Sequence, residues 1–160
     1  MQKDLSNIII WTENKPGVFF RILWLFRRKM FNIESATVGH TEVPGVTRFT
    51  ITVTGDKDKV RNMCKQIYKL VPILRVEDVS NENLVIRELA LMKVGIKNQE
   101  EKHDILRVLE HFRARVINMA KESLVIEVTG DEQKIDAFYE NMRMYKILEF
   151  VRTGRTALFK

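Results

Sequence analysis

The sequence predicts an α+β fold of two ferredoxin-like βαββαβ domains, each with an antiparallel sheet and both helices on one face. Some segments alternate apolar and polar residues with period two, whereas others place apolar residues at helical spacing. The stretch Ile51–Val60 returns 75 residues later as Ile126–Ile135, with six of ten positions identical. This offset is close to half of the 160 residues, so each half should carry the same order of elements.

The first half is predicted to form a strand over 6–13, a helix over 16–30, strands over 33–42 and 45–54, a helix over 57–70 and a strand over 73–79. The first strand follows from the apolar run 8–11, and the first helix from five apolar residues at helical spacing. Pro16 suits a first helical position because its missing N–H would have no partner there. Pro44 and Gly45 mark a hairpin turn, and Asp56 is a natural N-cap for the second helix.

The second half repeats this order with strand 85–96, helix 99–112, strands 115–121 and 123–129, helix 132–143 and strand 146–151. Lys121 and Glu122 mark its hairpin, and Asp131 is the natural N-cap of its last helix. We therefore expect one domain over 1–79, a polar linker over 80–83, and a second domain with a tail over 84–160.

Composition limits the class of protein. Hydrophobic residues make up 45% and charged residues 30% of the chain, which is typical of a globular protein. The longest apolar run has five residues, so no membrane span is expected. The sequence predicts no signal peptide. Cys64 is the only cysteine, so no internal disulfide can form. We expect a cytoplasmic location.

The turn between the first strand and the first helix is the best candidate for a binding site. Free N–H groups at a helix start attract a carboxylate, and Gly17 lets a small ligand approach the backbone closely. The amide of Asn14 can both donate and accept hydrogen bonds. Together with Val18, these groups are suited to an α-amino acid, with no metal and no catalytic residue required.

Both faces of some predicted strands are apolar. Ile8 and Ile10 point to one side of the first strand, and Ile9 and Trp11 to the other. Each half is also small for independent stability. A second copy of the domain, within or between chains, would cover the outer faces, so we expect a homodimer or a higher homo-oligomer.

Motifs along nearly the whole chain resemble the regulatory (small) subunit of acetohydroxyacid synthase, also called acetolactate synthase, a family with tandem ACT domains. The matching stretches include 13–18, 32–35, 87–94 and 134–138, and the pattern Arg-Thr-Gly-x-x-Ala-Leu over 152–158. Two positions depart from the family pattern, since Met30 and Lys146 stand where family members usually have Gly. A Gly at a helix end normally supplies φ > 0, so Met30 could shift the start of the next strand.

The resemblance implies a non-catalytic partner of a catalytic subunit that would carry thiamine diphosphate, Mg and FAD, with no cofactor in this chain. It implies activation of that subunit and feedback inhibition by valine in branched-chain amino acid biosynthesis. Carried over by position, Asn14, Gly17 and Val18 would form the loop side of the valine site, and Asn32 and Ile33 would complete it between two domains.

Several alternatives remain at the level of sequence. A stand-alone amino-acid-sensing ACT protein acting on another enzyme is the main rival. Nucleic-acid binding must be considered at a net charge of +6, but the outward positions of the predicted sheet are threonines rather than stacking aromatics. The three histidines are too isolated for a metal site. Phe20 and Trp24, opposite the apolar stripe of the first helix, either pack under another layer or form a contact between chains.

Overall fold

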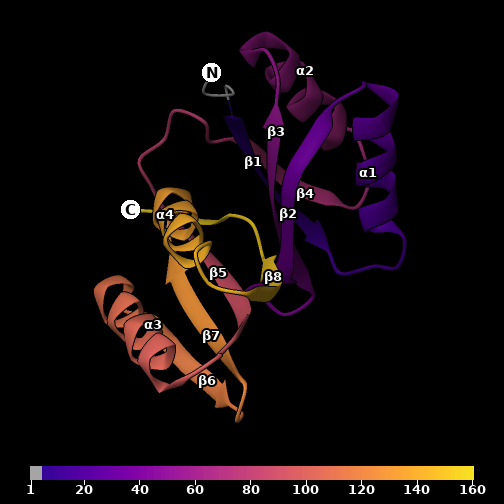
Figure 1. Ribbon diagram of the computed structural model, residues 1–160. Coiled ribbons are helices and arrows are strands. Elements are labelled where there is room, and N and C mark those ends of the chain that lie inside the picture. The colour runs from indigo at the N-terminus through magenta and orange to yellow at the C-terminus, as the bar shows by residue number, and fades with distance from the viewer. Residues whose placement is uncertain (1–4) are drawn as a thin grey trace. The chain divides into compact units, whose positions relative to one another are not determined.

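The computed structural model describes residues 5–160, and within them the order βαββαβ occurs twice before a final ninth strand (Figure 1). The elements are β1 (Leu5–Glu13), α1 (Val18–Arg28), β2 (Asn32–His40), β3 (Val46–Thr54), α2 (Lys57–Tyr68), β4 (Ile73–Asp78), β5 (Leu84–Gly95), α3 (Gln99–Phe112), β6 (Arg115–Met119), β7 (Ser123–Gly130), α4 (Glu132–Met142), β8 (Ile147–Arg152) and β9 (Thr156–Phe159). The predicted fold class of two ferredoxin-like domains is confirmed.

The chain divides into two compact units. Unit 1 holds the chain up to Val85 together with Arg155–Lys160, and unit 2 holds Ile86–Gly154. The sequence places residues 155–160 in the second domain, whereas in the structure they cluster with the first, because their hydrogen bonds go to β2 and β3. Strand β9 itself is not among the predicted elements.

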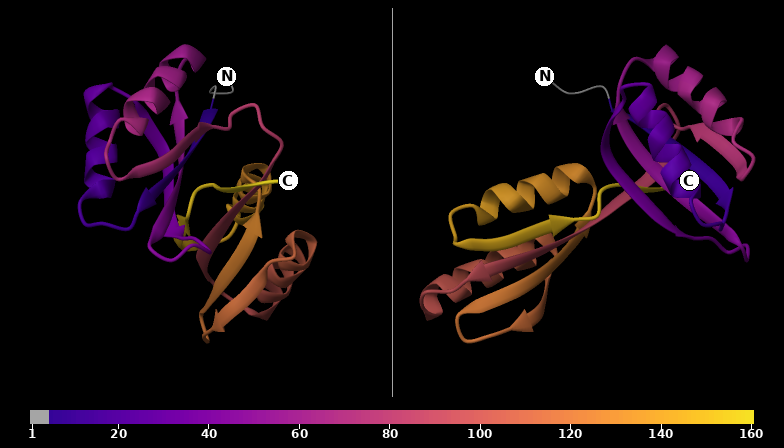
Figure 2. Two further views of the ribbon diagram at one scale, coloured as in Figure 1. Left: turned by 180° about the vertical axis from the view of Figure 1, so that it is seen from behind. Right: turned by 90° about the vertical axis from the view of Figure 1, so that its right-hand side faces the viewer.

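Unit 1 contains a four-stranded antiparallel sheet in the order β2-β3-β1-β4. Both helices lie on the same side of this sheet (Figure 2). Between them, apolar side chains from the helices and from β1, β3 and β4 form one core: Ile8, Ile10, Val18, Ile22, Leu25, Phe26, Phe49, Ile51, Val53, Val60, Met63, Ile67 and Ile73. Burial of this apolar stripe, rather than helix propensity alone, holds such short helices in place.

The opposite face of this sheet is covered in part by the segment 155–160. Arg48 donates from Nη2 to the carbonyl of Ala157 at 2.5 Å, and Thr37 donates from Oγ1 to the carbonyl of Arg155 at 2.9 Å. Ala157 is buried, and Ile9, whose side chain points to this face, is fully buried as well. Side-chain donors from the sheet thus bind the segment on this face, in addition to the backbone pairing of β9 with β5.

Unit 2 repeats the architecture with the strand order β6-β7-β5-β8. Its core is likewise mainly aliphatic, with one buried ring where the unit 1 core has two: Ala90, Met92, Val94, Ile105, Leu109, Leu124, Ile126, Val128, Ile135, Phe138 and Met142. The shared pattern explains why the two halves of the sequence resemble each other.

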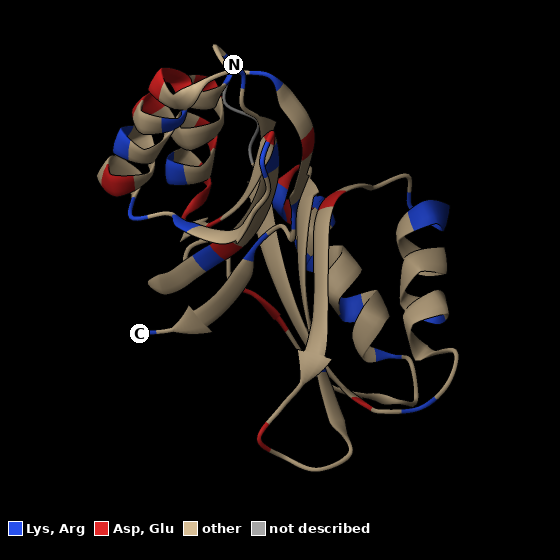
Figure 3. Cartoon of the chain, turned by 60° about the horizontal axis from the view of Figure 1, so that its bottom comes forward, with Lys and Arg blue, Asp and Glu red and all other residues tan. Residues whose placement is uncertain are grey.

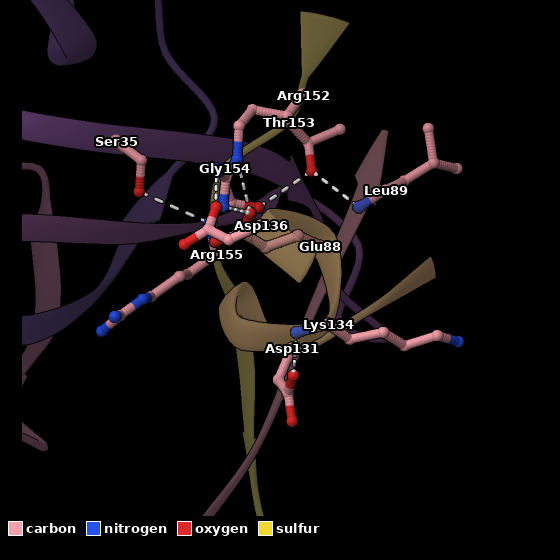
Figure 4. Close-up of polar contacts among 10 residues, drawn as sticks. All are labelled: Ser35, Glu88, Leu89, Asp131, Lys134, Asp136, Arg152, Thr153, Gly154 and Arg155. Carbon is pink, nitrogen blue, oxygen red and sulfur yellow. Dashed lines mark hydrogen bonds and ion pairs between the residues drawn. The ribbon is translucent and has the colours of Figure 1, made fainter. Parts of the chain in front are cut away.

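A charged network ties three elements of unit 2 together (Figure 4). Arg152 of β8 binds the buried carboxylate of Glu88 on β5 through Nε at 2.9 Å and Nη2 at 2.5 Å, and binds Asp136 of α4 at 2.8 Å. Burial alone would lower the pKa of Arg152, but the hydrogen bonds to the two carboxylates raise it. Next to this network, Thr153 bonds Leu89 through both its N–H and its hydroxyl.

Charges of both signs are spread over the elements rather than gathered into one basic stripe (Figure 3). Within residues 5–160, no helix combines the length and the apolar character that a membrane span requires.

Candidate effector-binding site

The turn between β1 and α1 is fixed from both sides by backbone hydrogen bonds. The N–H of Asn14 donates to the carbonyl of Gly45 in the β2–β3 hairpin at 2.8 Å, and the N–H of Lys15 donates to Glu13 at 2.9 Å. Gly17 then takes a left-handed conformation, φ 81°, as the N-cap of α1. Asn14 and Gly17 are both exposed, so the turn is open to a ligand.

The prediction that Pro16 occupies the first position of the helix is wrong. Helix α1 begins at Val18, and Pro16 lies in the turn before it. The reason is the conformation of Gly17, because a left-handed residue interrupts the run of helical dihedral angles. A Cβ on Gly17 would meet no atom within 4 Å, so this position needs glycine for its backbone conformation and not for space inside the free chain.

The start of α1 differs from the starts of the other helices. Asp56, Asn98 and Asp131 each accept a backbone N–H with their side chains at the starts of α2, α3 and α4. Helix α1 has no side-chain cap and no acidic residue in its first turn. Such a helix start carries partial positive charge and free donors, which is the arrangement that binds a carboxylate.

The individual amides of this turn differ in availability. The N–H groups of Gly17, Phe19 and Phe20 have no acceptor among the described residues, whereas the N–H of Val18 makes a long bond of 3.4 Å to the carbonyl of Lys15. The Val18 side chain belongs to the core. Phe19 and Phe20 are therefore two further donors that the sequence analysis did not name. The sequence feature that could have indicated these two donors is the absence of a capping side chain before α1.

Asn32 and Ile33 lie at the first two positions of β2. The Nδ2 of Asn32 donates to Oε1 of Glu34 at 2.9 Å, and the same carboxylate accepts the hydroxyl of Thr54 at 2.7 Å. Asn32 is exposed, and Ile33 is partly buried against the core. An amide group and an apolar surface therefore adjoin each other at this strand start.

Within one chain the two groups of predicted residues are not brought together. Glu13 pairs with Val46 on β3, whereas Asn32 pairs with Thr54, eight residues further along the same strand. At about 3.3 Å per residue, the two ends are roughly 26 Å apart. They are the opposite ends of α1 as well (Figure 1).

The departures from the expected glycines have different outcomes. Met30 does take φ 58°, so the helix ends as a glycine would end it and Asn32 keeps its place at the start of β2. Lys146 is not among the described non-glycine residues with positive φ, and its carbonyl accepts the N–H of Gly95 at 2.9 Å. No backbone strain follows from Lys146.

Neither a metal site nor a reactive thiol is found in the described part of the chain. Residues 5–160 contain no group of three His, Cys, Asp or Glu side chains that could hold a metal ion. Burial and, less strongly, Asp78 raise the pKa of the Cys64 thiol to about 12, which makes it a poor nucleophile. A hollow of about 440 Å³ lies beside β4, but its lining includes Glu77, Asp78 and Glu82, which would repel a carboxylate ligand.

Comparisons with known proteins identify the family of the chain. A family profile described as an AHAS small subunit-like ACT domain matches residues 8–75, and one described as the small subunit of acetolactate synthase matches residues 87–160. The probable acetolactate synthase small subunit of Archaeoglobus fulgidus is 44% identical over 154 residues, covering 96% of each chain. That of Methanothermobacter thermautotrophicus is 40% identical over 158 residues, covering 99% of this chain and 94% of the relative.

Similarity extends to bacterial proteins and to a solved structure. The acetolactate synthase small subunit of Bacillus subtilis is 42% identical over 152 residues, covering 94% of this chain and 87% of its own. The crystal structure of the small subunit from Thermotoga maritima superposes with a TM-score of 0.90 at 37% identity, covering 98% of this chain and 97% of that one.

Proposed function

This chain belongs to the family of acetolactate synthase small subunits, a regulatory subunit without catalytic activity of its own, and from that premise we propose how it acts. It binds the catalytic subunit of acetolactate synthase, raises its activity and makes it sensitive to inhibition by valine. Thiamine diphosphate, Mg and FAD belong to the catalytic partner in this proposal, and the complex is cytoplasmic.

The proposed valine site needs two copies of the chain. Strand β2 is an edge of the unit 1 sheet, so its outer side is free to meet a second β2. In a twofold dimer with the two β2 strands antiparallel, the α1 start of one copy meets the β2 start of the other. This arrangement brings Asn14 and Gly17 to the partner's Asn32 and Ile33, which one chain alone keeps apart.

Apolar side chains on the same flank support this dimer. Phe19 is 41% exposed and stacks on Phe49 with ring centroids 5.3 Å apart, and Val38, the partner of Phe49 in the strand register, is 49% exposed. These two side chains stand beside the free edge of β2. A second copy would cover them while it completes the site.

The chemistry of the site follows from the groups at its two ends. Free amides at the α1 start bind the carboxylate of valine, and the side-chain oxygens of Asn14 and Asn32 accept from its ammonium group. The apolar surface at Ile33 contacts the isopropyl group. One methylene is worth only about 1–3 kcal/mol, so leucine and isoleucine would bind with modestly different affinity.

Inhibition then requires two states of the holoenzyme. Valine that bridges two chains favours the dimer geometry that completes its site, and inhibition follows if this geometry activates the catalytic subunit less. Such coupling is typically about 1–3 kcal/mol, and by linkage the catalytic subunit changes the affinity for valine by the same factor.

Unit 2 carries no equivalent site in this proposal. The start of α3 is capped by Asn98, and Glu100 and Glu101 stand in its first turn. Glu101 accepts the N–H of Lys97 at 2.6 Å, so a carboxylate already occupies this helix start. We assign unit 2 a structural or docking role.

The observation that carries the proposal is the uncapped start of α1, placed at the far end of the helix from Asn32. Calorimetric titration with valine should give heat for the natural chain and little for Asn14→Ala, Asn32→Ala or Gly17→Asp, which adds a repelling carboxylate. Asn62→Ala, an exposed amide on α2, is the matched control and should bind normally. Gly17→Ala separates backbone strain from charge.

Mixing variants tests the division of the site between chains. Heterodimers of Gly17→Asp and Asn32→Ala contain one intact site and one doubly damaged site, so the mixture should regain part of the valine heat that each variant has lost. Unchanged valine affinity in the single variants, or no recovery on mixing, contradicts the site. Stimulation of acetolactate formation by this chain separates the proposal from a stand-alone sensor of another enzyme.

A further inference from the structure

The outward face of α1 exposes two aromatic side chains. Phe20 is 71% and Trp24 49% exposed. Each lies two positions from the fully buried Ile22, which at 3.6 residues per turn places both about 200° around the helix from the core side. Helix α1 lies at the periphery of unit 1, and no other element of that unit passes over this face (Figures 1 and 2).

Three unpaired arginines surround these rings. Arg21, Arg27 and Arg28 are exposed, and none of them forms an ion pair with an acid among residues 5–160. The helix itself has no Asp or Glu. Elsewhere in the chain, Arg75, Arg107, Arg143 and Arg152 are all paired with carboxylates. Arg61, Arg87, Arg113 and Arg115 form no ion pair within residues 5–160 either, so what marks α1 is that three such arginines flank two exposed aromatic rings on a helix without any acid.

One of these arginines is held against an aromatic ring. The guanidinium carbon of Arg28 lies 5.4 Å from the centroid of the Trp24 ring, which is a cation–π distance. This contact restricts both long side chains before any partner arrives, which lowers the entropic cost of binding through them. Trp, Phe and Arg are also enriched at the centres of interfaces between proteins.

A second copy of the chain is a poor occupant for this face. A twofold contact between two α1 faces would set arginines against arginines, and like charges that face each other across an interface weaken binding. The flank proposed for the valine dimer is also a different one, marked by Phe19 and the edge of β2 rather than by Phe20 and Trp24.

We propose that the outward face of α1, formed by Phe20, Trp24, Arg21, Arg27 and Arg28, docks the catalytic subunit. The surface it fits is an apolar pocket for the two rings with carboxylates at its rim. This inference rests on the proposed function, because it names the surface through which the same partner is bound.

The experiment measures affinity between the full-length chain and the catalytic subunit, together with activation, valine binding and dimer mass. Phe20→Ser combined with Trp24→Ser should weaken the affinity about tenfold or more, while valine binding and dimer mass stay unchanged. Tyr68→Ser, which removes an aromatic side chain 63% exposed on α2, is the matched control and should leave the affinity unchanged.

A charge variant tests the acidic rim. Arg27→Gln combined with Arg28→Gln should weaken the affinity at low salt and reduce its dependence on salt. Normal affinity in both double variants overturns the inference, and so does loss of valine binding and dimer mass, which would assign the face to the homodimer. Failure of the natural chain to bind or activate the catalytic subunit would instead refute the proposed function itself.

Discussion

At the scale of single residues, Met30 shows how neighbours can impose an unfavourable backbone conformation. Helix α1 ends in a Schellman motif, in which the N–H of Phe31 donates to Phe26 and the N–H of Met30 donates to Arg27, both at 3.0 Å. The Phe26 and Phe31 rings meet edge to face at 6.1 Å, which is the apolar contact that accompanies this motif. The motif requires φ > 0 at Met30, and the side chain, 90% exposed, makes no compensating contact of note.

Met30→Gly should therefore stabilise the protein. Glycine removes the left-handed strain, worth about 1 kcal/mol after its larger loss of backbone entropy is included. The measurement is urea unfolding followed by circular dichroism. Met144→Gly, at a residue that is 78% exposed without positive φ, is the control and should not stabilise. Equal losses of stability in both variants would show that the conformation of Met30 is not strained.

At the scale of elements, the repeated Gly-Asp turn explains why two helices could be located from sequence. Asp56 and Asp131 were predicted as N-caps, and both predictions are confirmed, since Asp56 accepts from Asp58 and Lys59 and Asp131 accepts from Lys134. The start of α1 has no such residue, and its boundary was predicted two residues early. The first residue of a helix can be predicted from sequence when a side chain caps it. It is harder to predict when the backbone conformation of a glycine sets it.

Asp131→Ala should cost about 1 kcal/mol of stability, because it leaves the N–H of Lys134 without its acceptor at 2.9 Å. Asp131→Asn retains an oxygen at the same place and should cost much less. The midpoint of thermal unfolding checks both variants. An equal shift for Ala and Asn would mean that the charge near the helix start, rather than the hydrogen bond, provides the stabilisation.

At the scale of the whole molecule, local patterns predicted the two βαββαβ units but not the return of residues 155–160 to unit 1. Strand β9 has four residues and no periodicity, it pairs with the distant β5, and the side chains of Thr37 and Arg48 that bind the segment lie more than a hundred positions away. The candidate site shows the same limit. Asn14 and Gly17 are three positions apart and lie in one turn, whereas Asn32 lies at the opposite end of the strands and would join them only in the proposed dimer.

Arg48→Ala should loosen the segment 155–160. Arg48 donates a hydrogen bond to the carbonyl of Ala157. Burial lowers the pKa of Arg48, whereas the charges of Glu42 and Glu77 act in the opposite direction. Loss of this charged hydrogen bond should cost about 1.5–3 kcal/mol and speed hydrogen exchange in residues 155–160. Arg107→Ala, which removes an exposed ion pair on α3, is the control and should have little effect. Equal exchange in both variants would contradict this role.

The return of residues 155–160 has a consequence for how the protein is made and handled. During translation, the whole of unit 2 must emerge from the ribosome before the last piece of unit 1 becomes available. Until then Ile9 and the threonines of β3 lack part of their cover. A fragment cut after Val85 would keep that uncovered surface permanently, so its solubility and its ligand affinity would report on an unfinished domain.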